Sequence, residues 1–156
     1  MSFDLFLQSF SQGEPAPANV SGARDFLTSL ENYNPNEFGW VNVKLPSGDE
    51  IEICGEGLWN DDESFEGAAL HLHGLTQERI NFIYNFANAA EFVIFNAQAN
   101  ENEPLVLMPP SFQKENLPKD IEDSAAQISC EKELWLLISD DFSRWQKFCD
   151  QVLSDN

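Results

Sequence analysis

The sequence predicts a single α+β domain covering residues 1–156, built on a mainly antiparallel sheet of about six or seven strands with about three helices. Two observations predict this class. Short apolar segments with strand-like alternation are separated by turn residues and interspersed with segments of helical periodicity. A chain of 156 residues has the size of one ordinary domain, and its 42% of hydrophobic residues can build a core, which excludes global disorder.

The first strand is expected over residues 3–10. Leu5 and Leu7 share one face of this segment, and Phe6 lies on the other. Apolar side chains on both faces predict a strand that is covered on both sides.

A helix is expected over residues 21–33, after a loop that contains glycine and prolines. Ser21 is its predicted N-cap, and the Asn-Pro-Asn sequence that follows ends it. The side chains expected to face inward are Phe26, Leu27 and Leu30.

The middle of the chain predicts a hairpin, an acidic loop and a further strand. Strands over residues 38–45 and 50–54 are joined by a Pro-Ser-Gly-Asp turn. The acidic loop spans residues 55–67, and the next strand is expected over residues 68–73.

The helix expected over residues 77–90 has the clearest pattern in the chain. Thr76 is its predicted N-cap, and apolar residues recur at helical spacing. These residues are Ile80, Ile83, Tyr84 and Ala87. With a strand before it and another expected over residues 92–96, the helix is compatible with one parallel crossover.

The C-terminal third is harder to interpret. A strand is expected over residues 105–108 and a polar loop over residues 111–123. The apolar run 133–138 is compatible with a strand or a helix, and we predict a strand. Asp140 or Asp141 then caps a last helix. The inward side chains of that helix are Phe142, Trp145, Cys149 and Val152.

Charge is the outlier of the composition. The chain has 27 Asp and Glu against 8 Lys and Arg, a net charge of −19. Such a surface repels nucleic acid phosphates and anionic membranes, and it attracts basic proteins over about a Debye length. We therefore expect a basic protein partner, with no binding to nucleic acid or to membranes.

The acids gather where bases are absent. Between Leu45 and Gln113 the only Lys or Arg is Arg79. Because adjacent carboxylates repel, a long acidic stretch indicates a docking surface for a cationic partner, although a solvated loop kept soluble by its charge is the alternative. The two aromatic rings of the loop have the composition of a binding hot spot or equally pin the loop to the core. The predicted partner-binding residues are Trp59, Asp61, Asp62, Glu63, Phe65 and Glu66.

Two patterns bear on metal binding. The oxygen-rich run 60–66 lacks the ligand spacing of an EF-hand. His71 and His73 share one face of a strand and could hold zinc together with a carboxylate, but their spacing specifies no third ligand. We expect two histidines on a polar face, with no metal and no cofactor.

The sequence carries no decisive catalytic motif. It contains no G-x-S-x-G and no Gly-rich phosphate loop, and Gly55-Glu56-Gly57 places a carboxylate where a phosphate would sit. The acids Asp140 and Asp141 are explained by helix capping. We expect no catalytic residues and a protein that is not an enzyme.

The three cysteines, Cys54, Cys130 and Cys149, are odd in number and widely spaced. Buried, reduced thiols are therefore expected. We expect no signal peptide, and no apolar stretch reaches the roughly 20 residues that span a bilayer. Together these features predict a cytoplasmic protein and leave its oligomeric state open.

Residues 2–10, followed by Gly13-Glu14-Pro15-Ala16, resemble the start of a group of small bacterial proteins. In size, acidity and lack of a catalytic signature the chain also resembles the immunity proteins of polymorphic-toxin and contact-dependent inhibition systems. This resemblance implies a bacterial protein that neutralises a basic toxin domain, often a nuclease, by covering its active site or a nearby surface.

The sequence thus predicts an acidic protein-binding inhibitor of the immunity-protein kind. One alternative is a small metal-dependent hydrolase that uses His71, His73 and a carboxylate. Another is a nucleic-acid mimic that binds a DNA-handling protein, which would share the electrostatics of the inhibitor and differ in its partner.

Overall fold

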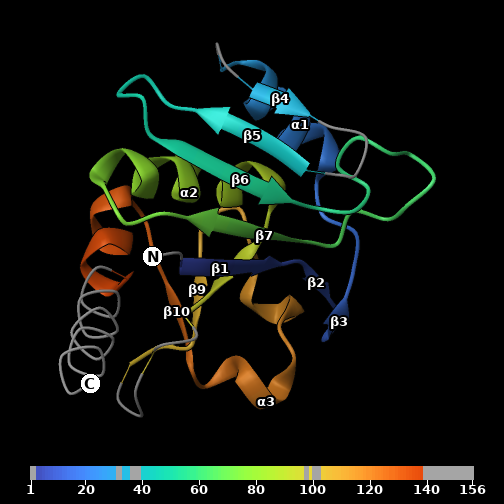
Figure 1. Ribbon diagram of the computed structural model, residues 1–156. Coiled ribbons are helices and arrows are strands. Elements are labelled where there is room, and N and C mark those ends of the chain that lie inside the picture. The colour runs from blue at the N-terminus through green and yellow to red at the C-terminus, as the bar shows by residue number, and fades with distance from the viewer. Residues whose placement is uncertain (1–2, 31–32, 36–39, 97–98, 100–102, 139–156) are drawn as a thin grey trace, which may run out of the picture.

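Alternating apolar residues make one twisted sheet the framework of this protein (Figure 1). The computed structural model describes residues 3–30, 33–35, 40–96, 99 and 103–138. Over these residues the fold is α+β with a mainly antiparallel sheet of 8 strands, which confirms the predicted class. The order of the strands across the sheet is β10-β9-β8-β1-β7-β6-β5-β4.

The strands of this sheet, in chain order, are β1 (Phe3–Gln8), β4 (Tyr33–Pro35), β5 (Trp40–Lys44), β6 (Glu50–Cys54), β7 (Gly67–Leu72), β8 (Val93–Phe95), β9 (Val106–Met108) and β10 (Ala125–Gln127). A separate small hairpin is formed by β2 (Phe10–Ser11) and β3 (Glu14–Pro15). The helices are α1 (Val20–Thr28), α2 (Gln77–Ala90), the 3-10 turn η1 (Lys114–Asn116) and α3 (Lys119–Glu122), and residues 131–138 are also helical.

Strand pairing places β1 between β7 and β8 and antiparallel to both. β7 and β8 are therefore parallel to each other, and α2 connects them, which confirms the predicted crossover. β5 and β6 form the predicted hairpin, with Val41 opposite Ile53 and Val43 opposite Ile51. Among directly paired strands of the described sheet, β9 and β10 run parallel to each other.

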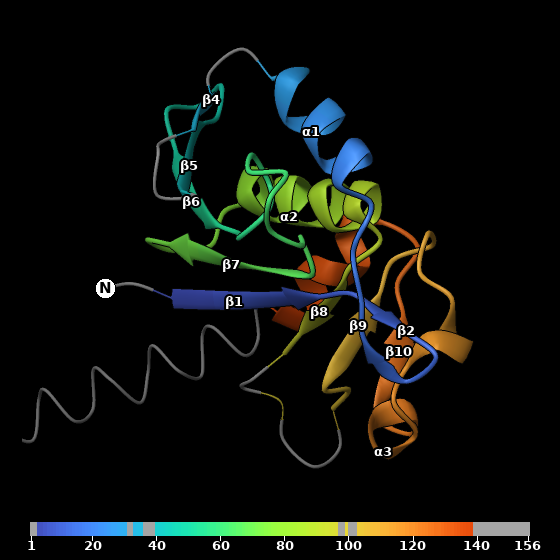
Figure 2. The ribbon, with the colours of Figure 1, turned by 90° about the vertical axis from the view of Figure 1, so that its right-hand side faces the viewer.

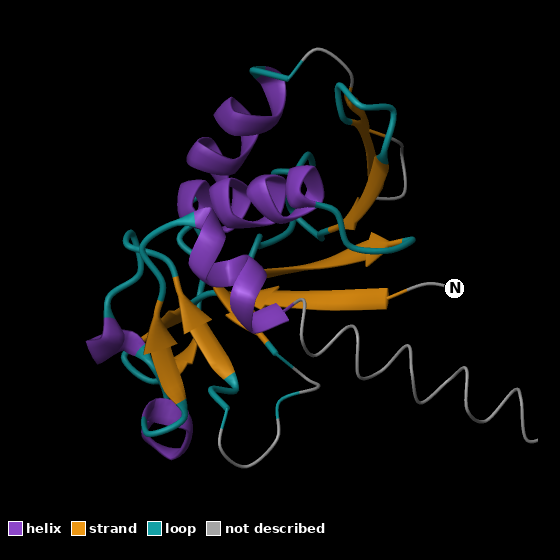
Figure 3. Ribbon diagram, turned by 90° about the vertical axis from the view of Figure 1, so that its left-hand side faces the viewer, coloured by secondary structure: helices purple, strands orange, loops and turns teal. Residues whose placement is uncertain are grey.

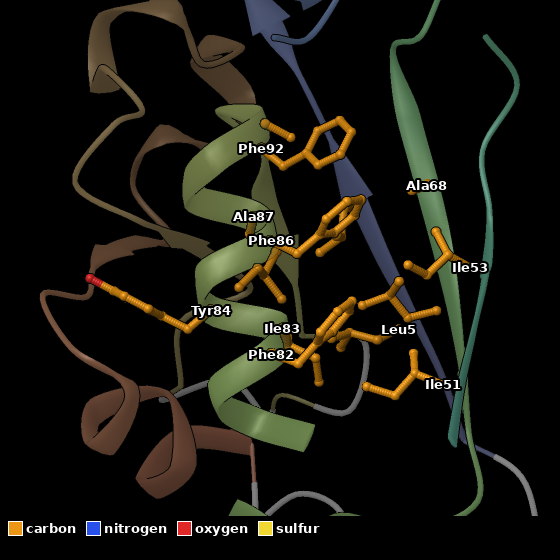
Figure 4. Close-up of a cluster of buried hydrophobic side chains, with 14 of the residues drawn as sticks. Leu5, Ile51, Ile53, Ala68, Phe82, Ile83, Tyr84, Phe86, Ala87 and Phe92 are labelled. Atoms are coloured by element: carbon orange, nitrogen blue, oxygen red, sulfur yellow. The ribbon is translucent and has the colours of Figure 1, made fainter. Parts of the chain in front are cut away.

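The main core lies between one face of the sheet and the helices. α1, α2 and the helix over residues 131–138 gather on that side, and the sheet curves around α2 (Figures 2 and 3). Phe82 and Phe86 of α2 stack with their ring centroids 5.8 Å apart and point toward Leu5 and Ile53 (Figure 4). Tyr84 points away from the strands, toward the C-terminal part of the chain (Figure 4).

A second, smaller core lies at the β8–β9 end of the sheet. It is built by Val93, Val106, Met108, Phe112 and Leu117, which pack together. Because Val93 alternates with Ile94, which belongs to the main core, this cluster lies on the opposite face of the sheet. That face is therefore covered at one end, where η1 and α3 are located (Figure 1).

Several predicted elements need correction. The run 133–138 is helical, so the predicted strand is wrong: Leu134 and Ile138, four residues apart, are buried, while Leu136 is 58% exposed. The first helix begins at Val20 after the N-cap Asn19, whose side chain accepts a hydrogen bond from Gly22 N. Ser21 is thus inside the helix, because an Asn two positions earlier supplies the cap.

The prediction that the first strand is covered on both sides is wrong at Phe6, which is 51% exposed. The cysteine prediction also fails in part, because Cys54 and Cys130 are free but only partly buried. Cys149 and the predicted last helix with its cap at Asp140 or Asp141 lie outside the described residues. None of the helices in the described part of the chain has the length and apolar character needed to cross a membrane.

Candidate functional site

The acidic loop connects β6 to β7 and projects beyond the ends of these strands (Figure 1). It covers residues 55–66, one residue fewer than predicted, because Gly67 begins β7. Its most exposed acidic side chains are Glu56, Asp61, Asp62 and Glu63. The loop therefore presents a group of carboxylates to solvent at one end of the sheet.

Two apolar side chains fix the loop to the body of the protein. Leu58 is fully buried, and Phe65 is 3% exposed, with its ring 5.2 Å from that of Phe92 in an edge-to-face arrangement. Phe65 therefore packs in the core and does not offer its ring to a partner. Of the two aromatic residues predicted as anchors, this leaves Trp59 as the ring that is partly exposed.

Arg24 links the acidic loop to α1. Its Nε donates to the carbonyl oxygen of Leu58 at 2.6 Å, and its Nη2 donates to Asp61 Oδ1 at 2.8 Å. The guanidinium carbon lies 5.7 Å from the ring centroid of Trp59, within cation–π distance. One side chain thus fixes the backbone, one carboxylate and one ring of the loop, an arrangement that the spacing of 37 residues between Arg24 and Asp61 does not reveal.

Further contacts also fix the position of Trp59. Its ring stacks on Tyr33 of the edge strand β4, with centroids 6.0 Å apart and planes 16° apart. Its Nε1 is buried and has no hydrogen-bond partner among the described residues. The contacts of the Trp59 ring therefore stabilise the loop, and a ligand could contact the part of the ring that stays accessible to solvent.

The backbone of the loop is ordered by local hydrogen bonds. Asn60 Oδ1 accepts from Asp62 N at 3.0 Å, and the carbonyl oxygen of Asn60 accepts from Glu63 N at 3.2 Å. Gly57 has φ of +82°, and a Cβ there would lie 2.6 Å from Glu63 O. The loop thus has a defined shape, with Asp62 and Glu63 on a turn at its tip.

The carboxylates of the loop are mostly without cations. Among the described residues, Asp61 pairs with Arg24, and no ion pair involves Glu56, Asp62, Glu63 or Glu66. Glu66 is half-buried at the base of the loop, where its carbonyl oxygen accepts from Ser9 N at 2.9 Å. The uncompensated negative charge therefore runs from the base of the loop to its tip.

The two histidines lie on the sheet face that α1 and α2 leave uncovered. His71 Nδ1 is 2.6 Å from Asp4 Oδ1, and its ring centroid is 5.2 Å from that of His73. Glu52 is the cross-strand neighbour of His71 on β6. The part of the chain that the structure describes holds no group of three His, Cys, Asp or Glu side chains placed to bind a metal ion, so the zinc hypothesis gains no third ligand.

Comparison of the chain with protein-family models, with curated proteins and with solved structures finds no match.

Proposed function

We propose that this protein binds and inhibits a basic protein, in the manner of the immunity proteins that neutralise bacterial toxin domains. The observation that carries the proposal is the shaped acidic loop, whose Glu56, Asp62 and Glu63 are exposed without cations while Arg24 and Phe65 hold the loop to the core. A structured loop of like charges has a repulsive cost, which binding of a cationic surface would remove.

The proposed mechanism has two stages. The net charge of −19 first steers a basic partner toward the protein, and the loop then docks on it. Asp62 and Glu63 would pair with Lys or Arg side chains that otherwise hold an anionic substrate, such as the phosphates of a nucleic acid. Because the loop is already ordered, little conformational entropy is lost on docking. The expected location is the cytoplasm, where such a toxin would act.

The first test is an affinity pull-down of the tagged protein from the organism that makes it, with elution by stepped salt and identification by mass spectrometry. We expect one basic protein in near-stoichiometric amount. Retention of nothing at low salt, or of a neutral or acidic protein alone, would contradict the proposal.

The second test places the contact on the loop. The variant Asp62→Lys/Glu63→Lys spares Asp61, which pairs with Arg24, and should slow association with the captured protein by about tenfold or more and weaken its salt dependence. The matched control, Glu115→Lys/Asp120→Lys, changes the net charge equally at exposed positions in η1 and α3. Equal slowing by both variants in stopped-flow measurements would show that the net charge acts and that the loop is not the contact.

A further inference from the structure

The sheet face opposite α1 and α2 carries a row of apolar residues that crosses five strands. Strand register makes each residue the direct neighbour of the next, across β8, β1, β7, β6 and β5. This apolar row consists of Phe95, Phe6, Ala69, Cys54 and Trp40. At about 4.8 Å between strands, the row is about 19 Å long.

Two of these side chains are exposed to solvent, and the other three are partly accessible. Phe6 is 51% exposed and Trp40 is 40% exposed, and with Leu136 they form the group of exposed large hydrophobic residues in the described part of the chain. The other three members of the row are partly buried. Two large exposed rings joined by a continuous apolar row are typical of an interaction surface.

Two hollows open along the row, one over most of its length and one at its Trp40 end. The first, of about 450 Å³, lies between Phe6, Phe95, Gln8 and the base of the acidic loop at Glu56 and Glu66. It connects the apolar row to the acidic loop in one surface. The second, of about 360 Å³, is lined by Trp40, Asn34, Asn42 and Glu52. Each hollow thus combines an aromatic ring with carboxylate, the environment that an Arg or Lys side chain prefers.

The residues beside the row include four acidic side chains, Asp4, Glu52, Glu56 and Glu66. Along one side, Asp4, His71, Glu52 and Asn42 are cross-strand neighbours in the next register position. Along the other side, the lining of the first hollow contains Glu56 and Glu66 and no Lys, Arg or His among its described residues. A ligand that covers the row therefore needs an apolar strip with cations beside it.

We infer that this face is the docking surface for a segment of the cationic partner that carries apolar residues flanked by Lys or Arg. The inference rests on the proposed function, which supplies the positive charge of the partner. It adds the apolar part of the interface. The apolar row would supply buried contact area, while the acidic loop, continuous with it through the first hollow, would supply steering and ion pairs.

Charge complementarity selects this occupant over the others. A second copy of the chain would bring a net charge of −19 against Asp4, Glu52, Glu56 and Glu66. Residues 139–156 of the chain itself contain four Asp against one Arg and one Lys, so they too are acidic. An anionic membrane is repelled for the same reason.

The test uses a defined probe, so it does not depend on the identity of the partner. The probe is a fluorescent 14-residue peptide of Leu and Lys with helical apolar spacing, and a Ser–Lys peptide of equal charge isolates the electrostatic part. Phe6→Ser should weaken binding of the Leu–Lys peptide by about fivefold or more, since half of a Phe side chain is exposed for burial. Trp40→Ser repeats the test at the other end of the row.

The matched control is Leu136→Ser, because Leu136 is similarly exposed but belongs to the helix over residues 131–138. It should change the affinity by less than twofold. Equal effects of Phe6→Ser and Leu136→Ser, or no effect of either, would overturn the inference. So would a dimer in sedimentation equilibrium that Phe6→Ser dissociates, or backbone amide shifts in residues 139–156 caused by Phe6→Ser without peptide.

The two proposals fail separately. If the pull-down yields a basic protein whose affinity depends on Asp62 and Glu63 but not on Phe6, the inference is wrong and the proposed function stands. If the Leu–Lys peptide binds at the row but no basic protein is captured, the surface is correct and the proposed function is wrong.

Discussion

Gly57 shows how a single residue determines the shape of the acidic loop. Its φ of +82° lies in the left-handed region, and the backbone at Glu63 O and Phe65 N lies 2.6 Å from where a Cβ would be. No other residue type fits there without moving the loop. The sequence shows this glycine two positions after Gly55, but it does not show which backbone atoms approach it.

Gly57→Ala should therefore destabilise the protein by at least about 3 kcal/mol, because the positive φ and the backbone overlap act together. Gly48→Ala is the matched control, since Gly48 has φ of +97° but no atom within 4 Å of the position that a Cβ would take. That variant should lose only about 1–2 kcal/mol, from the backbone conformation alone. Urea unfolding followed by Trp fluorescence measures both, and equal losses would show that the close approach at Gly57 has no energetic effect.

The site residues divide at the same scale into those that the sequence identifies and those that it does not. The exposed positions of Asp62 and Glu63 follow from local charge and turn composition, which are properties of adjacent residues. The role of Arg24 and the burial of Phe65 depend on contacts with distant parts of the chain, at Leu58 and Phe92. No local pattern carries that information.

At the scale of elements, the helix with the strongest signals of its own is predicted correctly. Thr76 Oγ1 accepts from Arg79 N at 3.1 Å as the expected N-cap of α2, and Ile80, Ile83 and Ala87 are buried as the spacing predicts. In the run 133–138 every residue from Leu134 onward is apolar, so the run has no contrast between faces and its period cannot be determined.

The short strands β4 and β10 escape prediction for a different physical reason. β10 has the sequence Ala-Ala-Gln, and β4 contains Pro35. Both have low intrinsic strand propensity, and both lie at the edges of the described sheet, where a neighbouring strand determines their conformation. β10 forms because it pairs with β9 across a polar segment that the sequence presents only as a loop.

The start of the helix over residues 131–138 gives a prediction with a defined sign. Glu133 accepts hydrogen bonds from Ser129 Oγ at 2.8 Å and from Ser129 N at 3.0 Å, and these bonds lower the pKa of the Glu133 carboxyl below its ordinary value. Since the folded-state pKa is lowered, the stabilisation is present above the unfolded pKa and is lost as the pH falls through the folded pKa.

Ser129→Ala should raise the pKa of Glu133 toward its ordinary value, because it removes the hydroxyl donor, which is the largest cause of the shift. Ser129→Thr keeps a hydroxyl and should leave the pKa low. A carboxyl ¹³C NMR titration measures both variants. An unchanged pKa in the Ala variant would show that the hydroxyl bond has no effect on the ionisation of Glu133.

At the scale of the whole molecule, the described residues cover one face of the sheet with helices and the other face only at its β8–β9 end. The helices lie on one side of the sheet (Figure 3). Leu5, Ile53 and Leu70 are buried in the core on that side, while Phe6 and Trp40 are exposed on the other face. Alternation predicted both faces to be apolar in the first strand, but it could not show that the described chain covers only one end of the second face. The face that carries Phe6 lies beside the acidic loop, so apolar contact and charge occur on adjacent surfaces.

The net charge of −19 on this surface also bears on the stability of the molecule as a whole, because like charges repel one another most strongly in the compact state. Raising the NaCl concentration from 10 mM to 300 mM shortens the Debye length from about 30 Å to below about 8 Å and should relieve that repulsion. We expect the melting temperature in calorimetry to rise by about 4–8 °C, which corresponds to about 2 kcal/mol for a domain of this size. The Asp62→Lys/Glu63→Lys and Glu115→Lys/Asp120→Lys variants have smaller net charges and should both gain less from salt.

A melting temperature that is independent of salt in all three proteins would show that self-repulsion does not limit stability. The acidic surface would then have no folding cost for a partner to offset.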